Sequence, residues 1–186
     1  MNGTALETKL IQRMRRSKWA IFVSGTGSNL SALLETRDRI DIALVVSSRN
    51  DALALVRARR AGVATLILPK KIDWPALLDE LNRREITHIF LAGFMRIVPA
   101  EFLEDFSGKV FNIHPSILPS YPGLNSLERA YEDRAELGCT VHEVVPEVDA
   151  GPIRLQAKVV RSQSLSRTEL SLHIAEHRLV RKAVEL

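Results

Sequence analysis

The sequence has little of several features that mark whole classes of protein. Cys139 is the only cysteine, so no disulfide can form within the chain, and a reducing, cytoplasmic compartment is the simplest expectation. No apolar run approaches the roughly 20 residues that span a bilayer. The first 18 residues lack the apolar core of a signal peptide. Internal repeats and low-complexity segments are also absent. A disulfide-stapled scaffold, a membrane-spanning protein and a repeat array are therefore not expected.

Signatures of metal and nucleic-acid binding are missing as well. No His or Cys spacing is typical of a zinc site, so we expect no metal. The formal net charge of +4 is mild: it favours anionic small molecules but is too small to indicate nucleic acid. Hydrophobic residues make up 46% and charged residues 26% of the chain, as in an ordinary globular protein. We expect small-molecule partners, no nucleic acid, no membrane, and a monomer or homodimer.

The length of 186 residues predicts one domain, over residues 19–186. Residues 1–18 form an N-terminal extension in which basic side chains outnumber acidic ones. A basic targeting peptide and a frayed helical extension both agree with this composition, and we prefer the second.

The first half of the chain alternates short apolar runs with segments of helical spacing. Strands are predicted at Trp19–Val23, Ile42–Val46, Thr65–Leu68 and His88–Ala92. Helices are predicted between them, over residues 29–34, 52–61 and 75–84. Apolar strands that alternate with helices indicate a parallel sheet covered on both faces.

The second half of the chain does not continue this regular alternation of strands and helices. A fifth strand, Val110–His114, runs into a proline-rich loop over residues 115–123, which is followed by a helix over 124–134. Strands over 138–145 and 151–160 are separated by a connection too short for a parallel crossover, which favours an antiparallel hairpin. A helix over 168–184 closes the chain. The fold class is α/β, with one mixed, mainly parallel sheet.

A glycine-rich loop, Gly25-Thr26-Gly27-Ser28-Asn29, lies between the first strand and the first helix. Such a loop can bring backbone N–H groups and a helix N-terminus to a phosphate. A β-carbon at position 27 is expected to crowd that ligand. A dinucleotide fingerprint would place a third glycine where this chain has Leu30, which weakens a nicotinamide site. A tight turn without any ligand is the other interpretation of the loop.

Asn112 and His114 form the most suggestive polar pair. Strand alternation places them on one side of the fifth strand, at its carboxyl end, where open α/β sheets bind ligands. An amide beside an imidazole suits the stabilisation of an oxyanion. Asp149 could orient the imidazole and favour its protonated form if the fold brings it near, although an aspartate beside a glycine is also ordinary turn chemistry. We interpret His88 and His142 as structural.

Several segments together resemble the phosphoribosylglycinamide formyltransferase family, folate-dependent enzymes of purine synthesis. They occur in the family's order and are SGTGSNL (24–30), LAGFMRI (91–97), FNIHPSILPSYPGL (111–124), GCTVH (138–142), VDAGP (148–152) and Glu176-His177. The resemblance implies the formyltransferase fold, with a Rossmann-like first half and an antiparallel hairpin in the second. It implies transfer of the formyl group of 10-formyltetrahydrofolate to the glycinamide amine of a phosphoribosyl compound. No covalent enzyme intermediate is expected.

Site residues follow from the resemblance position by position. Asn112, His114 and Asp149 match the catalytic trio. The phosphate loop is matched by Gly27, Ser28 and Asn29, and His173 stands where relatives often carry a longer cationic or amide side chain that helps to bind the phosphate. Glu176 matches a carboxylate that binds the ribose or glycinamide. The folate pocket is matched by Met95, Arg96, Ile97, Val98 and the backbone of Val145–Asp149. The sequence has Trp74-Pro75 where relatives often have an arginine.

Three other functions share parts of this pattern. A methionyl-tRNA formyltransferase would need a second, RNA-gripping domain for which the chain has no room. A formyltetrahydrofolate hydrolase uses the same trio but lacks this Gly-Ser-Asn loop and usually has an extra regulatory domain. A non-catalytic nucleotide-binding module would need the loop but not the trio.

Overall fold

The computed structural model describes residues 16–186. Residues 1–15, and with them most of the predicted N-terminal extension, lie outside the described part. The sheet begins earlier than the sequence indicated: Lys18 opens strand β1 (Lys18–Val23), and the Ser17 carbonyl oxygen accepts a hydrogen bond from Asp41 N–H at 3.1 Å. Lys18, which was predicted to lie in the extension, thus belongs to the sheet.

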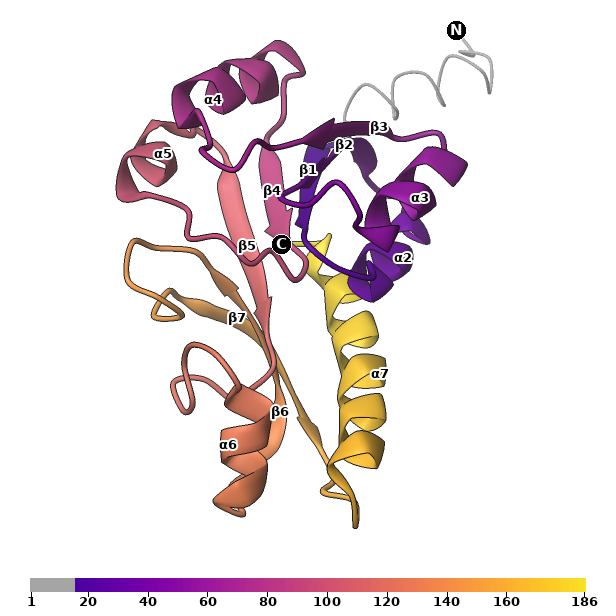
Figure 1. The fold of residues 1–186 in the computed structure, drawn as a ribbon, viewed down its shortest axis with the longest axis vertical. Coiled ribbons are helices and arrows are strands. Elements are labelled where there is room, and N and C mark those ends of the chain that lie inside the picture. The colour runs from indigo at the N-terminus through magenta and orange to yellow at the C-terminus, as the bar shows by residue number, and fades with distance from the viewer. Residues whose placement is uncertain (1–15) are drawn as a thin grey trace, which may run out of the picture.

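One mixed sheet contains seven strands in the order β3-β2-β1-β4-β5-β6-β7 (Figure 1). The strands are β1 (Lys18–Val23), β2 (Asp41–Ser47), β3 (Ala64–Ile67), β4 (His88–Leu91), β5 (Lys109–His114), β6 (Leu137–Glu143) and β7 (Ile153–Val159). The pairs from β3 to β5 are parallel, and β6 runs antiparallel to both β5 and β7. The predicted mixed sheet with a final hairpin is confirmed.

Helices cover both faces of the sheet (Figure 1). The helices are α2 (Ser28–Leu34), α3 (Leu53–Arg60), α4 (Trp74–Arg83), α5 (Ala100–Asp105), α6 (Ser126–Glu132) and α7 (Leu165–Ala183). Residues of α2, α3, α6 and α7 share one buried cluster, and residues of α4 and α5 share another. Among residues 16–186, none of the helices is long and apolar enough to cross a membrane.

Strand β1 shows why a central strand is apolar after its first residue. Trp19, Ile21 and Val23 pack into the cluster of α2, α3 and α7, whereas Ala20 and Phe22 pack into the cluster of α4 and α5. Successive side chains of a strand point to opposite faces, so a central strand with two covered faces buries every residue. Each large side chain buried in this way contributes roughly 1.5–3 kcal/mol.

The structure corrects the sequence prediction at several elements. Strand β3 is the sheet's edge, and its Ala64 and Ile67 are exposed, so the prediction that the first four strands are covered on both faces is wrong there. Helix α5 was not predicted. Helix α7 begins at Leu165, three residues before the predicted start, because the Ser164 side chain accepts a hydrogen bond from Arg167 N–H.

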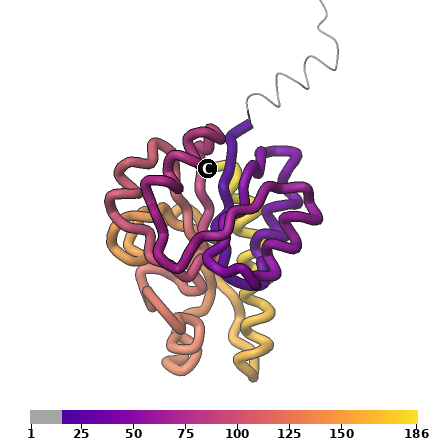
Figure 2. Tube along the Cα trace, turned by 45° about the horizontal axis from the view of Figure 1, so that its top comes forward, coloured from indigo at the N-terminus to yellow at the C-terminus, as the bar shows by residue number. Residues whose placement is uncertain are grey.

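Several loops meet at the carboxyl ends of the central strands. Met95, after β4, donates its backbone N–H to Ser24 Oγ, after β1, at 2.9 Å. Helix α6 (orange) and the first turns of α7 (yellow) extend from the same end of the molecule (Figure 2), and both helices contact β6. Loops from both halves of the sheet therefore surround the end of β5.

Candidate active site

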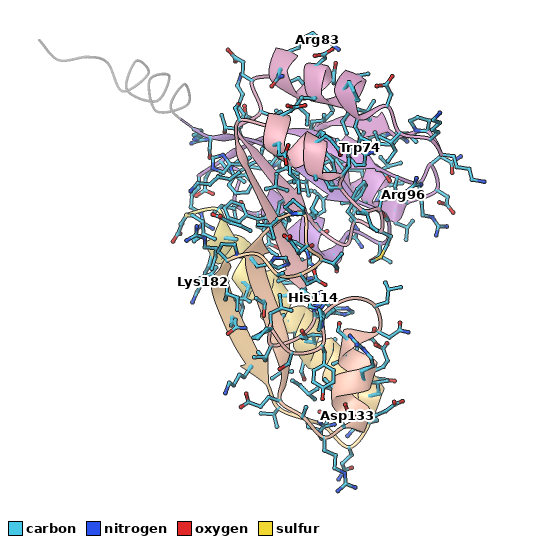
Figure 3. All side chains as sticks on the ribbon, turned by 90° about the vertical axis from the view of Figure 1, so that its left-hand side faces the viewer. Trp74, Arg83, Arg96, His114, Asp133 and Lys182 are labelled. Atoms are coloured by element: carbon cyan, nitrogen blue, oxygen red, sulfur yellow. The ribbon has the colours of Figure 1, made fainter. Side chains whose placement is uncertain are left out.

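Asn112 and His114 lie where strand β5 leaves the sheet. Phe111 and Ile113 pack under α2, α6 and α7, and Val110 packs under α4 and α5. Alternation puts Asn112 and His114 on the same face as Val110, further along the strand. His114 lies between the α6 segment, marked by Asp133, and the part of the molecule that holds Trp74 and Arg96 (Figure 3).

Asp149 reaches the pair from the loop between β6 and β7. Its Oδ2 atom lies 3.2 Å from His114 Nδ1 and accepts a hydrogen bond from Gly123 N–H at 2.8 Å. Its Oδ1 atom lies 3.4 Å from Asn112 Nδ2. A β-carbon on Gly151 would lie 1.8 Å from the Glu143 carbonyl oxygen, so only glycine permits this tight return of the chain. The structure thus brings together the three side chains of the predicted trio.

The electrostatics of His114 differ from the sequence-based expectation. Burial is the largest influence and lowers the pKa of His114 below its ordinary value. The Tyr121 carbonyl and the Asp149 charge raise the pKa without compensating for burial. Since Nε2 lies 2.9 Å from Tyr121 O and Nδ1 faces Asp149, both ring nitrogens point at acceptors, and a neutral ring can donate to one of them only. Asp149 favours the protonated His114 ring, as expected, but its effect on the pKa of His114 is smaller than that of burial.

Asp149 itself remains ionised. Burial would raise its pKa, but the contacts with His142, Gly123 N–H and His114 together lower the pKa below its usual range. A partly buried carboxylate beside an imidazole is suited to accept, hold and pass on a proton.

His142 is a member of this cluster that sequence reasoning treated as structural. Its Nε2 atom lies 3.1 Å from Asn112 Nδ2 and 3.5 Å from Asp149 Oδ1. The β5–β6 register pairs Asn112 directly with His142. The signal was present in the strand alternation that puts His142 on the face of Thr140, but the register that aligns two separate strands could not be read from the sequence.

Helix α3 packs against the glycine-rich loop. Gly27 has φ +75°, and a β-carbon there would lie 2.7 Å from Ala54 Cβ. The expectation that such a carbon would crowd a ligand is therefore corrected: it would collide with α3 first. Arg57 of α3 donates to the Thr26 carbonyl at 2.9 Å and to Ser31 Oγ at 2.9 Å. These contacts hold Ser28 and the first turn of α2 in place.

Asn29 and Glu176 meet where α2 packs against α7. Asn29 Nδ2 donates to Glu176 Oε2 at 3.2 Å, and both residues are buried. Asn29 Oδ1 is buried without a hydrogen-bond partner. Burial raises the pKa of Glu176 above its ordinary value, while Asn29 and the charge of His173, one turn earlier in α7, lower it. A buried, unpaired amide oxygen is costly and is satisfied by a ligand that brings a donor.

The segment predicted to line the folate pocket follows β4. Met95 is 69% exposed and Ile97 is 78% exposed, whereas Val98 is buried. Val148, in the loop that carries Asp149, is 60% exposed, and Val145 at the start of that loop is half-buried. Exposed apolar side chains on two loops near a polar centre suit a flat, partly apolar ligand.

Cationic groups border this segment. Arg96 donates to the Lys70 carbonyl at 2.8 Å, and an open cavity of about 450 Å³ is lined by Arg96, Lys70 and Arg49 among others. Trp74, which stands where an arginine was expected, packs against Phe102 of α5 with ring centroids 5.1 Å apart. Trp74 thus belongs to the packing of α4 on α5. Over residues 16–186, no group of three or more His, Cys, Asp or Glu side chains could hold a metal ion.

Comparison with known proteins identifies a family and several relatives. The family described as formyl transferase matches residues 17–184. Phosphoribosylglycinamide formyltransferase of Haemophilus influenzae is 42% identical over 154 residues, which covers 76% of this chain and 72% of the relative. The trifunctional purine biosynthetic protein adenosine-3 of Drosophila melanogaster is 39% identical over 186 residues, covering 91% of this chain but 14% of that protein. The chain thus spans a small part of the trifunctional relatives.

A solved structure shares the architecture. The crystal structure of phosphoribosylglycinamide formyltransferase from Anaplasma phagocytophilum superposes with a TM-score of 0.87 at 36% identity, covering 92% of this chain and 87% of the other. The match includes the mixed sheet, its parallel portion and its final antiparallel strands.

Proposed function

The chain belongs to the formyl transferase family, and from this premise we propose that it transfers the formyl group of 10-formyltetrahydrofolate to the glycinamide amine of phosphoribosylglycinamide. The observation that carries the proposal is the meeting of Asn112, His114 and Asp149 at the carboxyl end of β5. Relatives that bear the name phosphoribosylglycinamide formyltransferase support this acceptor and the transfer of a formyl group.

The acceptor binds between the glycine-rich loop and α7. The first N–H groups of a helix have no intrahelical acceptor, so those near Gly27, Ser28 and Asn29 can hold the phosphate. Asn29 Oδ1, buried and unpaired, and Glu176 beside it receive hydroxyl or amine donors of the ribose or glycinamide. His173, one turn before Glu176, adds cationic charge when protonated.

The donor folate binds on the other side of Asn112. Met95 and Ile97 offer exposed apolar surface, and Arg96 and Val98 complete that wall. The backbone of Val145–Asp149 supplies hydrogen-bonding groups to the polar edge of the pterin. The cations around Arg96 and Lys70 suit the carboxylates that every folate carries.

The chemistry is a direct transfer. As the neutral amine attacks the formyl carbon, negative charge develops on the formyl oxygen. Asn112 Nδ2–H and an N–H of His114 donate to that oxygen, and the developing charge itself raises the proton affinity of the His114 ring. Asp149 accepts the proton that the amine loses, directly or through water, and delivers it to the departing folate nitrogen. One C–N bond forms, one breaks, and no covalent bond to the protein is made.

The hydrolase and the binding module fit less well. A hydrolase needs only water at the acceptor position and has no use for the buried Asn29–Glu176 pair beside the glycine-rich loop. A binding module has no use for a partly buried carboxylate held between two histidines.

The trio is tested by steady-state kinetics on single variants. Asn112→Ala and His114→Ala should each lower kcat by roughly 10²–10³ with little change in either KM, because each removes one donor to the oxyanion. His88→Ala is the matched control, since His88 is half-buried against Trp19 at the opposite end of the sheet, and should keep kcat within a few-fold. Wild-type turnover in His114→Ala, or an equal loss in His88→Ala, would remove the trio from the catalytic centre.

A further inference from the structure

We propose that His142 is a positioning residue for Asn112: its unprotonated Nε2 accepts a hydrogen bond from the amide and fixes which end of that amide faces the transferred formyl group. The proposal rests on the proposed function, and it adds a fourth side chain whose effect reaches the reacting atoms only through Asn112. It stands on the geometry of three contacts.

The first contact fixes the tautomer of His142. Its Nδ1 atom lies 2.9 Å from the carbonyl oxygen of Glu143, which can only accept. In the neutral ring the hydrogen therefore resides on Nδ1, and Nε2 carries a lone pair. His142 is 2% exposed, so no bulk water competes for that lone pair.

The second and third contacts fix the amide. His142 Nε2, at 3.1 Å, and Asp149 Oδ1, at 3.4 Å, both lie within reach of Asn112 Nδ2. Both atoms are acceptors, so the flipped amide would set its own oxygen against two lone pairs. Asn112 Nδ2 donates one hydrogen to His142 Nε2, the nearer acceptor. Its other hydrogen faces the more distant Asp149 Oδ1 and can be donated to the oxyanion when that atom lies closer.

Loss of the His142 acceptor would leave the orientation of the Asn112 amide less firmly fixed. An Asn112 amide without it can turn its oxygen toward the site, which replaces a donor by an acceptor where negative charge develops. The same happens if the ring becomes charged, because Nε2–H would then donate to Asp149 Oδ1, 3.5 Å away, and repel Nδ2–H. The titratable groups against the ring are His114 and Asp149; Glu143, next in the strand, is paired with Arg154 of β7 at 2.6 Å.

A structural histidine would satisfy the same burial, so the test must separate the two roles. His142→Leu removes the acceptor and His142→Gln keeps one. We expect His142→Leu to lower kcat by about 10-fold or more, but by no more than Asn112→Ala, for which roughly 10²–10³ is expected. Both KM values should change little. His142→Gln should recover most of the lost rate.

The double variant carries the decisive comparison. Because His142 acts through Asn112, Asn112→Ala/His142→Leu should be no slower than Asn112→Ala. Multiplied losses, or a His142→Gln as slow as His142→Leu, would overturn the positioning role. His88→Leu serves as the control for replacing a half-buried histidine at a distance from the site.

A spectroscopic measurement keeps the inference separate from the proposed reaction. Long-range ¹H–¹⁵N spectra of the folded chain at neutral pH report which nitrogen of His142 bears hydrogen, with His142→Gln used for assignment. We expect the hydrogen on Nδ1 and an unprotonated Nε2. Hydrogen on Nε2 would overturn the inference even if formyl transfer is observed. The expected tautomer without any formyl transfer would instead count against the proposed function alone.

Discussion

Asp149 connects three parts of the site. It accepts a hydrogen bond from Gly123 in the loop after β5, and it faces His114 on β5 and His142 on β6. Its backbone has φ +54°, a conformation that is uncommon outside glycine and is better tolerated by aspartate than by most residues. The loop from β6 to β7 thus takes a strained shape that presents one carboxylate to two imidazoles.

The charge of Asp149 should be visible in the pH–rate profile. Asp149→Asn keeps the shape and removes the charge. Because the Asp149 charge raises the pKa of His114 against the stronger effect of burial, its loss lowers that pKa further. Protonated His114 then loses its proton at lower pH, so the limb of kcat that falls as pH rises should move to lower pH. The rate at the optimum should also fall by roughly 10²–10³. A profile that keeps its position, or moves to higher pH, would refute this role; Asp133→Asn on α6 is the control.

The residues of the trio were predictable to different degrees. The placement of Asn112 and His114 on one face at the end of their strand was predictable from strand alternation, and both stand out as polar residues in an apolar strand. Asp149 was assigned from the family resemblance, because no local pattern reveals a distance across two loops. His142 was interpreted as structural, and the role that we propose for it depends on the β5–β6 register that pairs it with Asn112. Register is set by packing along the whole hairpin and by the glycines that permit it, not by any residue near His142.

At the scale of elements, the glycine-rich loop depends on helix α3. Gly27→Ala should lower the free energy of unfolding by about 1–3 kcal/mol, because the residue must keep a left-handed conformation and its new carbon meets Ala54. Gly25→Ala, in the same loop, is the matched control: its β-carbon would meet nothing within 4 Å, and the change should stay within about 0.5 kcal/mol. Urea unfolding measures both. Equal losses in the two variants would show that contact with α3 does not govern this loop.

The elements themselves were largely predictable, and the exceptions have physical reasons. Each of the seven strands contains a run that was predicted as extended. In the central strands the reason is that burial on two faces demands a continuous apolar run. Helix α5 was missed because it has six residues, and its formation depends on Phe102 and Phe106 packing beside Trp74 and Val110 in the core of that face. Strand β3 was taken for a covered strand because an edge position is a property of topology, and Thr65 and Leu66 give no local sign of it.

At the scale of the whole molecule, the change of strand direction locates the site. Strand β5 pairs in parallel with β4 and antiparallel with β6. Its carboxyl end therefore meets the segment that follows β4 and carries Met95 to Val98, and the chain that leaves β6 returns over it with Asp149. Helices α2 and α7, between which we propose that the acceptor binds, pack on the opposite side of β1 from α4 and α5. In this proposal donor and acceptor approach Asn112 from two directions.

The most direct measurement follows the formyl group itself. Purified protein is incubated with 10-formyltetrahydrofolate whose formyl carbon is ¹³C-labelled, together with glycinamide ribonucleotide, with methionyl-tRNA or with water alone. We predict that the label appears on the glycinamide amine, at a rate that depends on both substrates, and that neither labelled formate nor formylated tRNA accumulates at a comparable rate. Label released as formate at the same rate without glycinamide ribonucleotide, or no loss of donor in the presence of any acceptor, would refute the proposed formyl transfer.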